Sequence, residues 1–238
     1  MGAGENPAEN PNRLLALLDS LRTVLIQSGI VVLLFSIAGY FFSLRILVFL
    51  RARTGVKLAA FGVPEAFIAL LTLSLATGLI AGVPFICYRI LSELAFFFSS
   101  FSRRMMLGFW VSSILLFIGG AVFCLAVTLP YGVRFLLNFQ APYLAAVISV
   151  KKFVSFCFLL VFGFGCIFEL PLAMILVARL GLVEAGVLAR HRRGAILGIS
   201  VISAILTPTP DIFNMALMGV PLYLLYEVGL IGMRIWRK

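Results

Sequence analysis

One acidic residue, Glu169, lies well inside a long apolar stretch, in the run Phe168-Glu169-Leu170-Pro171. A carboxyl group surrounded by apolar side chains is costly unless it is paired, neutral or in contact with water, and a low dielectric favours its protonated form. Such a group can recognise a partner or carry a proton. Its structural alternative is a hydrogen bond between two helices. Pro171 is expected to kink the helix here because proline has no backbone N–H.

Two further charged groups lie near the ends of apolar stretches. Glu227 can reach interfacial water or contact a partner. The run Arg-His-Arg-Arg at 190–193 is typical of a basic anchor at a membrane surface. His191 is the one histidine of the chain, which excludes two-histidine metal sites. Because no helix carries paired acids and no nucleophile motif is present, the sequence predicts no enzyme, no metal and no cofactor.

The composition excludes a soluble protein. Hydrophobic residues make up 63% of the 238 positions and charged residues 12%, with a mean hydropathy of +1.16. Soluble domains are roughly half apolar and about a quarter charged, so this much apolar side chain cannot be buried in a soluble fold of this size. A soluble enzyme and a nucleic-acid-binding domain are therefore excluded. The net charge of +10 is assigned to lipid headgroups and topology instead.

Six apolar stretches predict an all-α membrane protein with six transmembrane helices. The first four reach the roughly 20 residues that span a hydrocarbon core of about 30 Å. The fifth is short, the sixth is interrupted by Glu227, and the Thr-Pro-Thr-Pro-Asp connection at 207–211 cannot continue a helix. The last two helices are therefore expected to form a short hairpin, with Asp211 as an N-cap. The stretches are residues 24–42, 66–88, 107–129, 153–178, 195–206 and 212–233.

The basic residues favour one orientation of this bundle. With both termini on one side, 12 of the 19 Lys and Arg residues lie on that side and 7 on the other, which predicts cytoplasmic termini. The organisation is then a cytoplasmic N-terminal segment (1–23), a six-helix transmembrane domain (24–233) and a cytoplasmic tail (234–238). The outer loops at 43–65 and 130–152 are apolar enough to predict interfacial helices or a cap on the bundle.

Two local patterns predict contacts. The Gly-x-x-x-Gly runs at 78–82 and 194–198 indicate close helix packing. The phenylalanines at 96–98 and 101 lie beside Arg103 and Arg104 in a loop that should face water. An apolar cluster in that position indicates either an interfacial helix or a peptide-binding surface.

Taken together, these motifs resemble the TatC family, the multispanning subunit of the twin-arginine, Sec-independent protein translocase. The resemblance is clearest in the C-terminal half, and the front half keeps the outline through Leu21-Arg22 and Pro64-Glu65-Ala66-Phe67. The matching C-terminal runs are Phe168-Glu169-Leu170-Pro171, Leu180-Gly181, Arg190-His191-Arg192-Arg193, Ala204-Ile205-Leu206-Thr207-Pro208, Asp211, and Val220-Pro221-Leu222-Tyr223-Leu224-Leu225-Tyr226-Glu227.

The resemblance implies a concave six-helix bundle with two short final helices, in the inner (cytoplasmic) membrane of a cell. It implies that the protein binds twin-arginine signal peptides of folded cargo at the cytoplasmic face. It also implies homo- and hetero-oligomers with TatA- and TatB-like single-span partners, and transport driven by the proton-motive force. Among the candidate site residues, Arg22, Glu169 and Glu227 rest on motif matches.

The chain departs from the family at two acidic positions. Ser20 stands where the pattern His-Leu-x-Glu-Leu-Arg has its acid, and Ser102 where the first cytoplasmic loop carries a Glu before basic residues. A neutral hydroxyl cannot supply the charge-assisted, bidentate contact that arginine favours. Asp19 and Glu93 lie nearby, and we hypothesise that they move the site. The candidate receptor surface is Asp19, Arg22, Glu93, Arg103 and Arg104.

Two alternatives stay open at this point. The chain can be a divergent TatC-like paralogue with lost or altered twin-arginine recognition. It can also be a proton-coupled small-solute transporter with Glu169 as the relay. The second alternative requires several polar groups near the midplane, and the sequence offers few besides Glu169 and Thr72.

Overall fold

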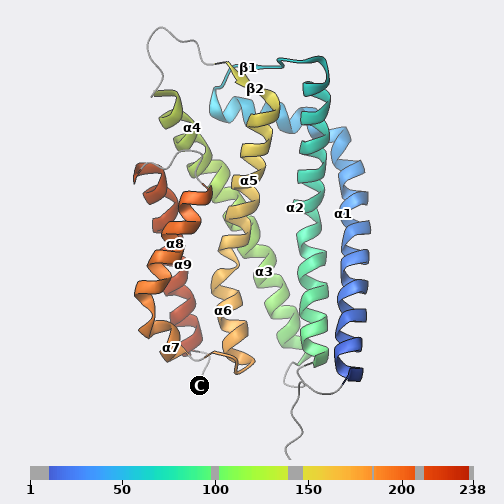
Figure 1. Ribbon diagram of the computed structural model, residues 1–238, viewed down its shortest axis with the longest axis vertical. Helices are drawn as coiled ribbons and strands as arrows, with labels where there is room; N and C mark the ends of the chain where they lie inside the picture. Colours follow the sequence, from blue (N-terminus) through green and yellow to red (C-terminus); the bar gives the residue numbers. More distant parts are fainter. Residues whose placement is uncertain (1–10, 98–101, 139–146, 184, 207–211, 236–238) are drawn as a thin grey trace, which may run out of the picture.

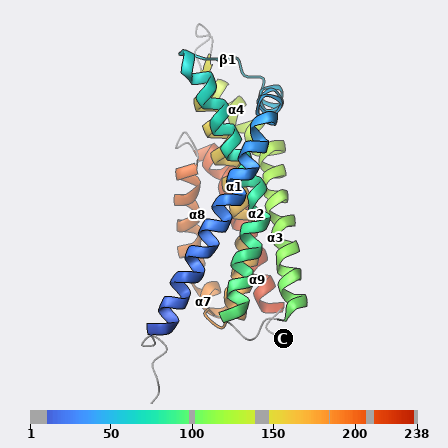
Figure 2. The same cartoon turned by 90° about the vertical axis from the view of Figure 1, so that its right-hand side faces the viewer.

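The first helix is longer than the apolar stretch that predicts it. In the computed structural model, which describes residues 11–97, 102–138, 147–183, 185–206 and 212–235, α1 (Pro11–Thr54) has 44 residues. Residues 11–23 are therefore helical and continuous with the first span. The last turns of α1 run across one end of the bundle (Figures 1 and 2). They pack Ile46, Leu47 and Leu50 on the core, which confirms a cap in this part of 43–65.

Helix α2 (Val63–Phe97) runs back along α1 and binds it through small polar residues. Ser74 Oγ donates a hydrogen bond of 2.6 Å to the backbone carbonyl of Ser36. Gly78 lies so close to α1 that a Cβ atom there would be 2.6 Å from the Ser36 backbone nitrogen. Small residues let two helices approach to this distance in a membrane, where apolar burial alone does not bring them together.

The two Gly-x-x-x-Gly patterns have different outcomes. The prediction for 78–82 is confirmed, since a Cβ at Gly82 would also lie 2.9 Å from Val32 Cγ2. The prediction for 194–198 is wrong, because among the described residues a Cβ at Gly194 or Gly198 would meet no heavy atom within 4 Å. A Gly-x-x-x-Gly run therefore indicates close packing only where a second helix lies against the face that carries the two glycines.

Helix α3 (Arg103–Phe123) continues through a π-helical segment (Cys124–Thr128) into α4 (Leu129–Asn138). Ser102 caps the start of α3, where its hydroxyl accepts a hydrogen bond of 3.4 Å from the Met105 N–H. At the far end of the bundle, β1 (Leu58–Ala59) pairs in parallel with β2 (Ile148–Ser149).

A break in the fourth span lies at Glu169, where the kink is expected. Helix α5 (Val150–Phe168) ends one residue before Glu169, and α6 (Leu170–Arg179) begins one residue after it. Pro171 is the second residue of α6, a position where a missing N–H breaks no helical hydrogen bond. The helix is therefore interrupted at the predicted place, and the interruption leaves the Glu169 side chain at the junction of two helices.

The last three helices are α7 (Ala185–Arg190), α8 (Arg192–Leu206) and α9 (Ile212–Ile235). With 15 residues, α8 covers about 23 Å at about 1.5 Å per residue, so it is short for a span, as expected. The helix α9 continues through Glu227, so the acid interrupts the apolar stretch but not the helix. Residues 207–211, including the predicted N-cap Asp211, lie outside the described residues.

The helices form one membrane-spanning bundle. The pair α1–α2 lies at one side, the pair α8–α9 at the other, and α3 and α5–α6 between them (Figure 1). The first turn of α1, the start of α3, α7 and the last turn of α9 lie at the same end, called the terminal end below. Five helical stretches of the described chain are long and apolar enough to cross a membrane, and α8 is the sixth apolar helix. The five are Asp19–Thr54, Pro64–Ala95, Arg103–Arg134, Val150–Arg179 and Met218–Ile235.

Candidate functional site

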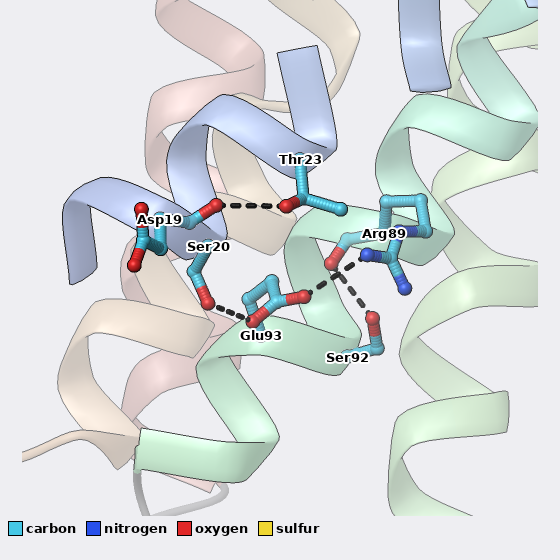
Figure 3. Close-up of polar contacts among 6 residues, drawn as sticks. All are labelled: Asp19, Ser20, Thr23, Arg89, Ser92 and Glu93. Atoms are coloured by element: carbon cyan, nitrogen blue, oxygen red, sulfur yellow. Dashed lines mark hydrogen bonds and ion pairs between the residues drawn. The ribbon is translucent and has the colours of Figure 1, made fainter. Parts of the chain in front are cut away.

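At the terminal end, α1 and α2 are joined by a side-chain contact across 73 positions of sequence (Figure 3). Ser20 Oγ donates a hydrogen bond of 2.8 Å to Glu93 Oε2. Arg89 Nη2 lies 3.2 Å from the other carboxylate oxygen, Glu93 Oε1. These three residues are called the Ser20–Glu93 joint below. It places a carboxylate directly beside Ser20, the first of the two positions where the resemblance leads us to expect an acid.

The helical register explains why these side chains meet. Ser20 lies one turn before the buried Val24, so it is on the face of α1 that packs against its neighbours. Arg89 and Glu93 are four residues apart on α2 and therefore share one face. Both side chains of the α2 pair are partly exposed, with 23% of Arg89 and 26% of Glu93 accessible. The joint is thus within reach of a ligand at the end of the bundle.

Within the described residues, the other members of the predicted receptor surface form no hydrogen bond or ion pair with this joint. Asp19 is exposed, and its carboxylate points away from Glu93 (Figure 3). Within the described residues its side chain has no ion pair; its backbone carbonyl accepts a hydrogen bond from Thr23. The three basic members are exposed as well: Arg22, Arg103 and Arg104. Residues 98–101 and the side chains of Phe96 and Phe97 lie outside the described part, so the phenylalanine cluster stays a prediction.

Glu169 forms a second polar site in the middle of the chain's fourth span. It is half-buried, and its Oε1 accepts a hydrogen bond of 2.9 Å from the hydroxyl of Ser113, a buried residue on α3. In the described part of the chain, Oε2 has no hydrogen bond. The carboxyl group therefore combines the structural alternative, a hydrogen bond between helices, with one oxygen that is free for a further donor.

Glu227 is held within the α8–α9 pair. Its Oε1 accepts a hydrogen bond of 2.9 Å from the Tyr223 hydroxyl, and its Oε2 lies 3.0 Å from Arg192 Nη2. Arg192 belongs to the basic run that the sequence assigns to a membrane anchor, so this arginine also ties α8 to α9. A partner that contacts Glu227 must do so beside these two internal donors.

Arg192→Met is expected to lower the free energy of unfolding by about 0.5–1 kcal/mol, because it removes a half-exposed ion pair. Arg193→Met is the matched control, since Arg193 is exposed and has no ion pair within the described residues. Thermal unfolding in detergent measures both variants. The loss should disappear in about 1 M salt; equal losses for both variants at low salt would contradict a role of the Arg192–Glu227 pair.

The contacts of two residues at these sites, Arg89 and Ser113, are not predicted from the sequence. Arg89 enters the sequence analysis only as one of the 12 Lys and Arg residues counted on the side of the termini, although its spacing of four from Glu93 is a signal that pairs them. Nothing in the sequence around Ser113 indicates that it bonds to Glu169. Among the described residues, no group of three or more His, Cys, Asp or Glu side chains could hold a metal ion.

Comparisons with known proteins agree with these observations. The profile of the family described as "Sec-independent protein translocase protein (TatC)" matches residues 16–221. TatC of Desulforapulum autotrophicum is 34% identical over 227 residues, which cover 93% of this chain and 84% of that protein. TatC of Carboxydothermus hydrogenoformans is 32% identical over 225 residues, which cover 93% of each chain. A crystal structure of the "Twin Arginine Translocase Receptor- TatC" superimposes with a TM-score of 0.83 at 31% identity, covering 93% of this chain and 99% of that one.

Proposed function

The chain belongs to the TatC family of Sec-independent protein translocases, and we propose that its terminal end receives the twin-arginine signal peptides of folded cargo. It is a multi-pass membrane protein and a component of the translocase. In this proposal the terminal end faces the cytoplasm across the inner membrane, because the excess of basic residues lies there. TatA- and TatB-like single-span proteins assemble with it, and the proton-motive force drives transport.

The Ser20–Glu93 joint is the observation that supports signal-peptide binding. Ser20 stands where the family pattern places an acid on the first helix, and a carboxylate oxygen of Glu93 lies 2.8 Å from its hydroxyl. A carboxylate therefore lies beside the position where the family pattern has its acid, although it belongs to α2 and not to α1. A carboxylate can bind a guanidinium group through two parallel hydrogen bonds, which an arginine-bearing peptide requires.

The remaining receptor residues take supporting roles in this proposal. Asp19 is the second acid, since it is exposed one position from Ser20 and has no ion pair within the described residues. Arg22, Arg103 and Arg104 are exposed at the same end and contact anionic lipid headgroups. Ser102 caps α3 and so leaves the second family acid without a local replacement.

Glu93→Gln is expected to weaken binding of a twin-arginine peptide by about tenfold, because a charged hydrogen bond is replaced by a neutral one. Asp19→Asn should have a smaller effect, about threefold, since an exposed charge is screened by water. The measurement is photo-crosslinking of a twin-arginine and a twin-lysine signal peptide to membranes that contain the wild type, each variant or the double variant.

The control for this experiment is the twin-lysine peptide. Stronger crosslinking of the arginine peptide near Ser20, lost with Glu93→Gln, supports the proposal. Equal crosslinking of both peptides, or binding unchanged in the double variant, would leave a divergent paralogue without arginine recognition.

A further inference from the structure

Arg89 already occupies the carboxylate that the proposed function assigns to cargo. We propose that Arg89 is an internal competitor for Glu93, and that a signal-peptide arginine binds by displacing it. This inference rests on the proposed function. It adds Arg89 as a residue that lowers the affinity of every peptide, because each peptide must first break the Arg89–Glu93 contact. It explains why an arginine lies on the same face of α2 as the receptor acid, at a distance of 3.2 Å.

The contact that holds Arg89 is weak in its geometry. The contact joins Arg89 Nη2 to one oxygen, Glu93 Oε1, at 3.2 Å, which is long for a charged hydrogen bond and uses one arm of the guanidinium fork. The order of the pair, Arg before Glu by four residues, is the less favourable one on a helix. Arg89 Nε is also buried and has no hydrogen-bond partner in the described part of the chain. An arginine held in this way is easily exchanged.

The opposite side of the carboxylate is fixed more firmly. The hydroxyl of Ser20 holds Glu93 Oε2 at 2.8 Å, so the acid keeps its position on the α1–α2 contact when Arg89 moves away. Serine suits this task better than a second acid, because two carboxylates at hydrogen-bonding distance would repel each other. About a quarter of each side chain in the Arg89–Glu93 pair is accessible, so an incoming guanidinium can approach from water.

Displacement of Arg89 sets a threshold for binding. The free energy needed to break the Arg89–Glu93 contact is the same for every peptide, so it lowers all affinities by the same factor. An arginine can replace the contact with a bidentate one, whereas a lysine offers a point charge and gains less. The affinity of a peptide without arginine then becomes too low for binding at the concentrations at which an arginine peptide binds.

Arg89→Gln tests the competition. We expect it to raise the affinity for both the twin-arginine and the twin-lysine peptide by about two- to fivefold, the range for loss of a partly exposed ion pair. Arg89→Met, which keeps the apolar stem packed, should give the same gain and guards against a folding defect of one variant. Affinities are measured by titration of the purified full-length protein in nanodiscs with fluorescent peptides.

The variant that combines Arg89→Gln with Glu93→Gln separates competition for the carboxylate from simple charge repulsion between Arg89 and the peptide. In the Glu93→Gln background, Arg89→Gln should give no gain, because no carboxylate is left to compete for. A gain that persists there, an unchanged affinity, or a loss in Arg89→Gln would overturn the inference while Glu93-dependent binding of the wild type still supports the proposed function. Binding that is independent of Glu93 in both wild type and Arg89→Gln would remove the proposed function and the inference together.

Discussion

Gly120→Ala is expected to lower the free energy of unfolding by about 1–3 kcal/mol, the range for overpacking in a close-packed interior. A Cβ atom at Gly120, on α3, would lie 2.6 Å from the backbone carbonyl oxygen of Phe164 and 3.0 Å from its carbon, on α5. Backbone atoms cannot rotate away as a side chain can. The two helices must therefore separate, and they carry the buried Phe117 and Phe164 of the central packing.

The adjacent residue, Gly119, provides the matched control. A Cβ at Gly119 would meet no heavy atom within 4 Å in the part of the chain that the structure describes, so Gly119→Ala should stabilise the helix by about 0.5–1 kcal/mol. Thermal unfolding in detergent compares the two variants, which lie at adjacent positions of the same helix. Equal effects of the two substitutions would show that α3 and α5 do not approach as closely as described.

Glu169→Ala is expected to reduce transport by about ten- to a hundredfold, because it removes a carboxyl group at membrane depth and leaves the Ser113 hydroxyl without its acceptor. Glu169→Gln should keep transport within about threefold of the wild type, since its amide oxygen can still accept from Ser113 and its amide can bond to a partner. Export of a twin-arginine cargo from cells that contain each variant is the measurement.

The comparison of these two variants decides between the two chemistries proposed for Glu169. A contact that works through hydrogen bonds tolerates glutamine, because the shape and the acceptor remain. A proton relay does not, because an amide cannot take up and release a proton at physiological pH. Loss of transport in Glu169→Gln equal to that in Glu169→Ala would favour the proton relay, and solute counterflow without partner proteins would then revive the transporter alternative.

The local features of the fold could be predicted because each depends on a few neighbouring residues. The apolar stretches follow from hydropathy, and the break at Glu169 from Pro171, since a proline acts on its own helix. The helices extend beyond the limits of the apolar stretches. Residues 43–54 continue α1 because nothing there stops a helix, and α9 passes Glu227 because one acid does not break the backbone hydrogen bonds.

The contacts between helices depend on the tertiary structure. Hydrophobic residues cover all sides of α1, α2 and α9, because lipid accepts an apolar side chain as readily as another helix does. The sequence therefore carries little information on which face meets which helix. The pairing of Ser20 with Glu93 and the bond of Ser113 to Glu169 depend on how these helices are rotated and aligned along their axes.

Hydropathy along the chain predicts several membrane crossings and an acid, Glu169, within one of them, and the resemblance to the family leads us to expect acids at the positions of Ser20 and Ser102. The position of Glu93 against Ser20, and its contact with Arg89, become known from the packed helices alone. The physical reason is that hydropathy and helix breaks act within one segment, whereas a carboxylate 73 positions away is placed by the packing of two complete helices.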